Sequence, residues 1–426
     1  MAQPSTLLRH PGFLQLWGAR TVSIVGNRIT ELALPLTAIG LLGASAFEVG
    51  LLVAAQYVPY LIIGLPAGAW IDRLRRRPVM IVADAVRCCV LLVVPLTAVA
   101  GMLQLWVLFP VAVTVGVMGV FFELAAQSYL PTLIGTRHLV EGNTKMELSR
   151  TAGELTGPGI GGLLVQWLTA PFAILADAAT FAISGLALLL IREKEPPPPP
   201  RKTDSSLIAE IRTGLRAVFA NPLLRPLALT GALANLFGFS GVLQAVLVLY
   251  CVRELQFSPF MLGAVLAGGN AGFLIGALLN RRMTSRFGIG PVMAGSITAT
   301  GAGVAILPLA SGGPMAGVVV VIGLVLIGAG IAAFNINQVS LRQSVTRPEL
   351  LGRMTATFRF VNWGAVPIGA LLGGALAGVI GIRAVLLLAA AGSLIAAVPL
   401  LLSPIRVLWE MPQGALDPQP VPAPFS

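Results

Sequence analysis

Charged residues are scarce in this chain. Only 11% of its 426 residues are Asp, Glu, Lys or Arg, whereas 56% are hydrophobic. A soluble globular protein carries about a quarter charged residues, so water does not cover most of this surface and lipid must. The long, continuous apolar runs also exclude a membrane β-barrel, whose strands alternate apolar and polar residues over short segments.

Cysteine and histidine are equally sparse, which removes several kinds of chemistry. The three cysteines form no CxxC pair, and Cys88 and Cys89 are adjacent within an apolar run. This spacing indicates no disulfide framework, zinc site or redox motif. The two histidines, His10 and His138, lie near predicted membrane edges, which excludes a buried histidine relay. We therefore expect no metal and no cofactor.

Motifs for nucleotides and nucleic acids are missing as well. There is no GxxxxGK[ST], and the GxGxxG match at 157–162 lies inside an apolar span rather than after a strand. The net charge of +11 is spread between apolar runs instead of forming a basic face, so we expect no nucleic-acid partner. No nucleophile–base constellation has a recognisable spacing. These absences exclude an ATP-driven pump and argue against an enzyme.

Apolar runs long enough to cross a membrane are what the sequence has in abundance. One span takes about 20 mostly apolar residues, and we predict an all-α membrane fold of twelve transmembrane helices. The predicted spans are 16–41, 47–70, 79–100, 104–130, 146–168, 171–191, 223–250, 258–280, 288–310, 315–338, 355–379 and 382–402.

The spans divide into two halves around a polar connection. We expect an N-terminal six-helix bundle over 1–191, a linker over 192–222, a C-terminal six-helix bundle over 223–403 and a tail over 404–426. The linker begins with a proline run at 196–200, which favours a stiff polyproline II spacer. Apolar residues at helical spacing follow it and predict an amphipathic helix on the membrane surface; the alternative is a loosely ordered linker.

The distribution of Lys and Arg over the connections between spans predicts the orientation of the chain in the membrane. Every second connection is basic, and the connections on the opposite side hold only Arg253 and Arg383. Cytoplasmic loops carry the excess of Lys and Arg. We therefore expect a multi-pass protein of a bacterial-type inner membrane, surrounded by its lipid bilayer, with both termini in the cytoplasm.

The two halves repeat each other. Arg150 precedes Pro158 by eight residues, and Arg359 precedes Pro367 by eight. Two six-helix halves in the same orientation imply a pseudo-two-fold axis along the membrane normal, with the substrate path between the halves.

Two motifs lie in the first half of the chain. The segment from Gly68 to Arg77 resembles the loop signature GxLxDRxGRR of the major facilitator superfamily, with Trp70 and Arg75 as departures. A second pattern, in the fifth span, resembles the antiporter motif of drug exporters, although the arginine usual in the fourth span is absent. Its residues are Gly153, Gly157, Pro158, Gly161 and Gly162.

The closer resemblance is to the branch that contains the enterobactin exporter and macrolide-efflux-like transmembrane secretion effectors. It is carried by Gly26-Asn27-Arg28, by residues 121–131 and by residues 349–354. This resemblance implies a monomeric secondary active transporter that exports small organic molecules, drug-like or siderophore-like, by alternating access. For the loop signature it implies a conformational latch at Asp72 and Arg73, which we extend to Gly68 and Arg76; plain positive-inside topology is the alternative.

Ionisable residues inside spans are candidates for coupling. A charge at the bilayer centre costs about 2.5–3.5 kcal/mol on insertion scales, so such residues face the bundle interior. A desolvated carboxylate binds a proton near neutral pH. The candidates for proton coupling are Glu31, Glu154, Asp177 and Glu123, and their charge partners or substrate contacts are Arg28, Arg150 and Asn27.

Each of these assignments has a structural alternative. Arg150 and Glu154 are four residues apart, which also fits a static intrahelical pair. Asp84 and Arg87 are more typical of a structural pair. The second-half spans contain no acid, so coupling belongs to the first half.

Aromatic residues such as Tyr57, Tyr60 and Trp363 line an organic-substrate site or pack helices. We predict proton antiport that exports small organic molecules. Proton-coupled import on the same fold and a non-transporting receptor or scaffold are the alternatives, and H⁺ is not distinguished from Na⁺.

Overall fold

The computed structural model shows an all-helical chain. It describes residues 6–71, 73–135, 138–193, 195, 207–238, 240–313, 315–346 and 350–412, and this part contains no strand. The predicted proline run, Asp72 and the tail beyond residue 412 lie outside the described residues.

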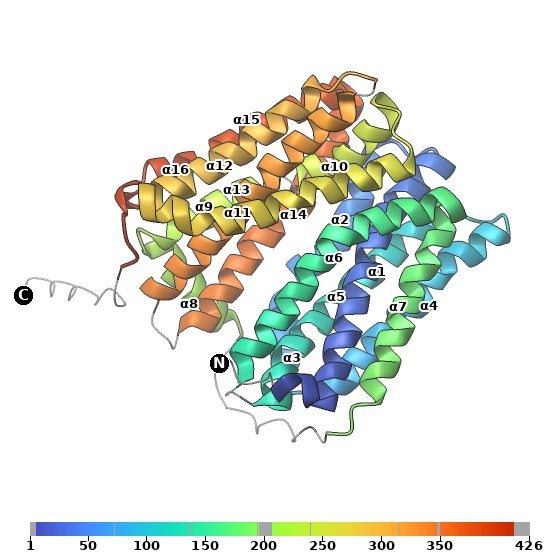
Figure 1. The fold of residues 1–426 in the computed structure, drawn as a ribbon, viewed down its shortest axis with the longest axis horizontal. Helices are drawn as coiled ribbons and strands as arrows, with labels where there is room; N and C mark the ends of the chain where they lie inside the picture. Colours follow the sequence, from blue (N-terminus) through green and yellow to red (C-terminus); the bar gives the residue numbers. More distant parts are fainter. Residues whose placement is uncertain are drawn as a thin grey trace, which may run out of the picture.

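The first half of the chain forms one helical bundle, drawn in blue to green in Figure 1. Its helices are α1 (Pro11–Leu36), α2 (Ala46–Ile62), α3 (Gly64–Ile71), α4 (Arg76–Val99), α5 (Leu105–Ile134), α6 (Leu139–Leu168) and α7 (Ala170–Leu189).

The second half forms a second bundle beside the first, drawn in yellow to red in Figure 1. It is preceded by the linker helix α8 (Leu207–Ala220), which packs on α14 and α9. The other helices are α9 (Leu224–Phe237), α10 (Val242–Leu249), α11 (Pro259–Phe287), α12 (Ile289–Ile306), α13 (Met315–Val345), α14 (Leu351–Ile380), α15 (Ile382–Ile395) and α16 (Val398–Leu401).

Twelve membrane crossings account for these helices. Nine segments of the described chain are long and apolar enough to span a bilayer, with α9 and α10 counted in one crossing. The other three crossings are α1, α6 and the pair α2–α3. Helices α1 and α6 carry the ionisable residues discussed below, and α2 is shorter than a span. The predicted all-α fold of twelve spans is therefore confirmed.

The internal repeat is visible in local backbone geometry. The first crossing ends in a π-helical turn at Thr37–Leu41, and the seventh ends in one at Tyr250–Glu254. Ser45 caps α2 and Ser258 caps α11, each by accepting a backbone N–H with its hydroxyl. The α6–α7 turn uses a residue with positive φ, as does its counterpart between α14 and α15.

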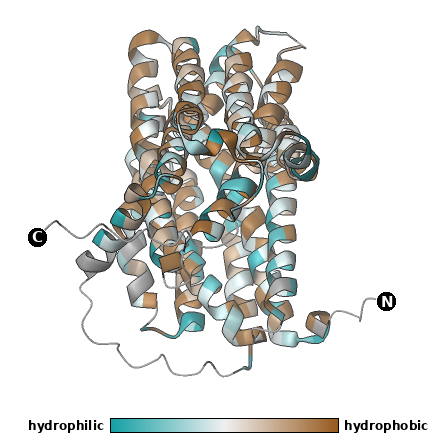
Figure 2. Cartoon of the chain, turned by 90° about the vertical axis from the view of Figure 1, so that its left-hand side faces the viewer, coloured by the Kyte–Doolittle hydropathy of each residue, from teal (hydrophilic) through white to brown (hydrophobic). Residues whose placement is uncertain are grey.

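The two ends of the molecule differ in charge. We call the end that holds the α3–α4 and α11–α12 turns the basic end, because Arg73–Arg77 and Arg281–Arg286 lie there. The opposite end, which holds the α1–α2 and α14–α15 turns, is called the far end. Figure 2 shows more teal, hydrophilic ribbon in the lower half of the view than in the upper half.

The bundles meet along two helix pairs, α2 with α14 and α6 with α11. Glycines bring the backbones together in the far-end half of each pair. A Cβ atom built on Gly50 would lie 3.0 Å from the Cα of Gly374, and one built on Gly162 would lie 2.8 Å from the Cα of Gly263. At these distances no side chain fits between the helices, so the bundles are in contact at the far end.

Candidate functional site

Helix α1 presents an ion pair within its own length. Arg28 and Glu31 are three residues apart, so they lie on neighbouring positions of one helix face. The Arg28 guanidinium donates to the Glu31 carboxylate at 2.5 Å, and each side chain is about one-third exposed. The predicted neighbours on α1 therefore bind each other.

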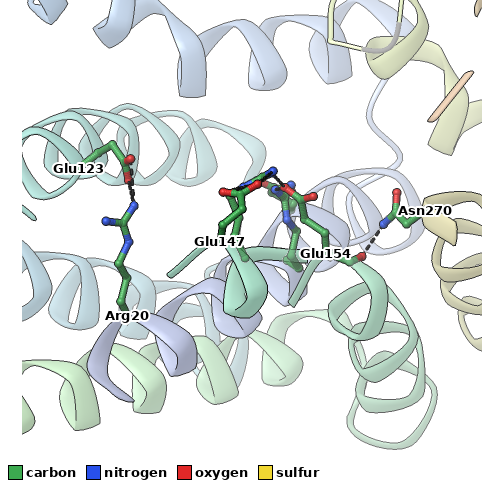
Figure 3. Close-up of polar contacts among 8 residues, drawn as sticks. Arg20, Glu123, Glu147, Glu154 and Asn270 are labelled. Carbon is green, nitrogen blue, oxygen red and sulfur yellow. Dashed lines mark hydrogen bonds and ion pairs between the residues drawn. The ribbon is translucent and has the colours of Figure 1, made fainter. Parts of the chain in front are cut away.

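Glu154 on α6 joins this pair to a second one. The Arg28 guanidinium also donates to Glu154 at 3.1 Å across the α1–α6 interface. Glu154 is only 16% exposed and accepts in addition from Arg150, which pairs with Glu147 as well. We call these five residues the acid–arginine network, and Figure 3 shows Glu147 and Glu154 within it.

The acid–arginine network has a net negative charge when all its members are ionised. It contains three carboxylates and two guanidinium groups, so one carboxylate is in surplus. Glu154 is the shared member, because it contacts both arginines while each arginine has a further carboxylate of its own. One proton on Glu154 therefore leaves two complete ion pairs, Arg28–Glu31 within α1 and Arg150–Glu147 within α6.

The glycines of the fifth-span motif explain why α1 and α6 approach closely enough for this contact. Gly157 faces Arg28, because a Cβ built on it would lie 2.9 Å from the Arg28 Cγ. Gly153 faces Ile24 and Gly161 faces Ile29 in the same way. The glycines of the motif therefore let α1 pack closely against α6.

The remaining residues of that motif face the other bundle. The carbonyl oxygen of Pro158 lies 2.5 Å from a Cβ built on Gly263, and Gly162 lies against Pro259 and Gly263 of α11. On the same helix pair, the Asn270 side-chain amide donates to the Glu154 carbonyl at 2.5 Å, as Figure 3 shows. Helix α6 therefore carries the acid–arginine network on one side and the bundle contact on the other.

A second ion pair ties α1 to α5. The Arg20 guanidinium donates to both carboxylate oxygens of Glu123, at 3.0 Å each, as Figure 3 shows. The Gln127 amide donates to the same carboxylate at 2.7 Å. Glu123 has one arginine partner of its own, so this pair has no surplus charge.

The Asp84–Arg87 pair is buried inside the first bundle. Arg87 donates to Asp84 at 2.5 Å, and the Ser184 hydroxyl donates to the other carboxylate oxygen at 2.5 Å. The guanidinium lies between the rings of Phe122 and Phe181, at 4.6 and 4.1 Å from their centroids. This arrangement is typical of a structural pair.

Asp177 on α7 is fully buried against α1. The Thr180 hydroxyl donates to its Oδ1 at 3.0 Å, and a Cβ on Gly26 would collide with the same oxygen. Its Oδ2 has no hydrogen-bond partner in the described part of the chain. Asn27, a predicted charge partner or substrate contact in the first span, is half-buried, and it has no hydrogen bond within the described residues. Asp177 thus stays apart from the acid–arginine network.

The predicted latch is only partly described. Asp72 lies outside the described residues, Gly68 lies in α3, and Arg73 is exposed. Arg76 begins α4, where its backbone N–H donates at 2.7 Å to the carboxylate of Glu195, a residue just beyond α7. That carboxylate also pairs with the Arg76 guanidinium at 3.5 Å and so ties the start of α4 to the segment after α7.

Aromatic rings connect the bundles between the far-end contact and the basic end. The Trp363 ring of α14 stacks on Tyr57 and Tyr60 of α2, with centroids 5.8 and 5.6 Å apart. One turn closer to the basic end, Arg359 is exposed and its charge acts on the Tyr60 phenol.

The sequence predicts no role for two residues described above, Glu147 and Arg359. Glu147 binds Arg150, and the signal for it was its position three residues before that arginine. The sequence identifies Arg359 only as part of the internal repeat. Its setting depends on how α14 packs against α2, which the sequence does not reveal.

Comparisons with known proteins match this architecture. A family model described as the Major Facilitator Superfamily matches residues 16–366 and 236–423. The multidrug efflux pump Tap of Mycolicibacterium fortuitum is 30% identical over 390 residues, covering 89% of this chain and 92% of its own. The enterobactin exporter EntS of Salmonella choleraesuis (strain SC-B67) is also 30% identical, with 87% of each chain covered. The crystal structure of the nucleoside transporter NupG superposes with a TM-score of 0.73, at 16% identity, over 92% of this chain and 98% of that one.

Proposed function

The chain belongs to the major facilitator superfamily, a family of transporters, and we propose that it exports small organic molecules by proton antiport. Relatives named as an efflux pump and as an exporter support the outward direction. The excess of arginine at one end supports a cytoplasmic position for that end and for both termini in an inner membrane.

The observation that carries the coupling proposal is the shared position of Glu154. Deprotonated Glu154 bridges Arg28 of α1 and Arg150 of α6. A proton on Glu154 abolishes this bridge and leaves each arginine with its second carboxylate. The two helices then lose their ionic link without leaving any arginine unpaired, which avoids the cost of an isolated charge at membrane depth.

Helix α6 gives this event a route to the bundle interface. The Glu154 carbonyl accepts the Asn270 amide of α11, and Gly162 of the same helix touches Gly263 of α11. A change in how α6 sits against α1 therefore acts on the contact that holds the bundles together. We infer that proton binding at Glu154 biases the two bundles between alternative arrangements.

Transport in proteoliposomes tests the proposal. The purified protein is reconstituted with an imposed pH gradient, and the movement of a panel of fluorescent amphipathic compounds is followed together with lumenal pH. We expect gradient-driven movement of at least one compound, with counterflow of protons. If no compound responds to the gradient, the exporter proposal fails.

Two variants separate coupling from transport. Glu154→Gln copies the protonated network and should abolish proton counterflow while downhill exchange of the compound persists. Glu31→Gln removes the surplus negative charge, so Glu154 stays ionised as the partner of Arg28, and this variant should also abolish proton counterflow. Glu254→Gln is the control, because this acid lies at the far end, where it pairs with Arg383 at 2.8 Å. Normal coupling in Glu154→Gln, at normal abundance, would refute the assignment. The direction of flux in intact cells decides between export and import.

A further inference from the structure

We propose that Arg359 and Trp363 of α14 bind the anionic, aromatic part of the transported molecule, an inference that rests on the proposed transport function and names its substrate class. The internal repeat first draws attention to these residues. Arg150 lies eight residues before Pro158 in α6, and Arg359 lies eight residues before Pro367 in α14. The two arginines are therefore equivalent positions of the two bundles.

The two arginines differ in the number of carboxylates beside them on the helix. Arg150 has Glu147 three residues before it and Glu154 four residues after it, and it pairs with both. The residues at the same spacing from Arg359 are Ala356 and Trp363. The second bundle has thus kept the guanidinium and lost both of its carboxylates, one of which is replaced by an aromatic ring.

Arg359 finds no substitute partner elsewhere. Within the described residues it has no hydrogen bond and no ion pair, and the sequence contains no Asp or Glu between Leu350 and Trp409. An unpaired guanidinium at membrane depth is costly. Arg359 lies six residues inside the apolar segment that begins at Arg353, which is about 9 Å along the helix axis. The described residues of the second bundle supply no counter-charge for it, and Glu123 and Glu31 of the first bundle already pair with Arg20 and Arg28.

Helix geometry directs Arg359 toward the bundle interface rather than toward lipid. At 100° per residue, Arg359, Trp363, Ala370 and Gly374 fall within about 60° of one another. Ala370 and Gly374 touch Gly50 of α2, and Trp363 stacks on the tyrosines of α2. Arg359 continues the same stripe one turn closer to the basic end, where it is exposed. This face of α14 therefore packs against α2 at Trp363 and is exposed at Arg359.

This combination selects a ligand chemistry. A guanidinium binds a carboxylate through two parallel hydrogen bonds. Trp363 is 40% exposed although it stacks on two tyrosines, so part of its ring remains available to a second aromatic surface. Arg28 and Arg150 of the first bundle do not compete for that group, because each already pairs with a carboxylate of its own helix. An aromatic molecule with an acidic group therefore binds with that group on α14.

Equilibrium binding to the purified full-length protein in lipid nanodiscs tests this. The probes are three molecules of one size: naphthalene-2-carboxylate, naphthalene-2-methanol and naphthalen-2-ylmethylammonium. We expect the carboxylate to bind at least about tenfold more tightly than the alcohol, because only the carboxylate forms charge-assisted hydrogen bonds with the guanidinium. Equal affinity for the carboxylate and the alcohol, or tighter binding of the ammonium probe, overturns the inference.

The variants locate the site. Arg359→Gln should abolish the preference for the carboxylate, Arg359→Lys should keep most of it, and Trp363→Leu should weaken the carboxylate and the alcohol alike. Arg216→Gln is the matched control, an exposed arginine on α8. A preference that survives in Arg359→Gln overturns the proposal. Binding needs no gradient, so a failure of export leaves this measurement intact, and loss of anion preference leaves the export proposal intact.

Discussion

The far-end contact between α6 and α11 gives the sharpest prediction for how the bundles move. Gly162→Ala places a methyl group against backbone, because its Cβ would lie 2.5 Å from the Pro259 carbonyl oxygen and 2.8 Å from the Gly263 Cα. Neither atom can rotate away as a side chain does. The two helices must therefore separate for the variant to fit.

The size of the effect follows from these distances. Ordinary contact begins near 3.4 Å, so α6 and α11 must part by about 0.6 Å at the Gly263 Cα and by about 0.9 Å at the Pro259 carbonyl oxygen. Overpacking of this kind costs about 1–3 kcal/mol. Because the contact exists only while the far end is closed, the whole cost acts on the balance between the two arrangements. The closed arrangement should lose about 5- to 150-fold in population relative to the alternative.

Gly159→Ala is the matched control. It lies on the same helix, and its Cβ would lie 3.7 Å from the Ala267 Cβ, which is ordinary contact. Both variants gain the same helix propensity, so the difference between them isolates the collision.

Spin-label distances measure the shift. In a background without the three cysteines, labels at Met102 and Leu309 report the far-end separation, because these exposed residues belong to different bundles. Gly162→Ala should increase the population with the longer distance, and Gly159→Ala should match the parent. Identical distance distributions for the two variants would show that the far-end contact does not control the arrangement of the bundles.

Two further predictions concern stability, read as the midpoint of thermal unfolding in detergent. Asp84→Asn should lower it strongly, since removing one partner of a buried ion pair costs about 3–5 kcal/mol and leaves Arg87 uncompensated. Glu254→Gln, at an exposed pair, should cost less than about 1 kcal/mol, and equal effects would contradict the structural role of the buried pair. Thr169→Gly should raise the midpoint, because Thr169 has φ 71° and ψ 160°, a region that costs a residue with a Cβ about 1–3 kcal/mol. Gly381→Ala, at the equivalent turn with φ 84°, should lower it, and unchanged midpoints in both variants would show that these turns are not strained.

The amino-acid sequence alone is enough to assign the class of the protein and much of its layout. Apolar runs about 20 residues long can be satisfied only by membrane-spanning helices, because backbone polar groups in lipid must bond within their own segment. The common spacing of Arg150–Pro158 and Arg359–Pro367 indicated the repeat, and similar π-helical turns and serine caps appear in both halves. The motifs around Gly68 and Gly157 pointed to the family that the comparisons establish.

Which ionisable residues contact one another depends on how the helices pack. Arg20 and Arg28 lie on one helix two turns apart, yet they pair with Glu123 of α5 and Glu154 of α6, which are more than 100 residues away. The periodicity of α1 gives the face of each arginine but not the helix that covers it. Glu154 becomes the shared carboxylate because glycines let α6 approach α1.

The same reason explains the residues whose roles sequence reasoning left open. Asp84 lies near Arg87 in the chain, but its burial with Ser184 of α7 is a product of packing. In the sequence, Arg359 resembles any arginine that follows a basic loop. Its exposed position beside α2, without a carboxylate partner among the described residues, becomes visible only in the packed structure. Local spacing fixes contacts within a helix, whereas contacts between helices depend on crossing positions that small residues and packing set together.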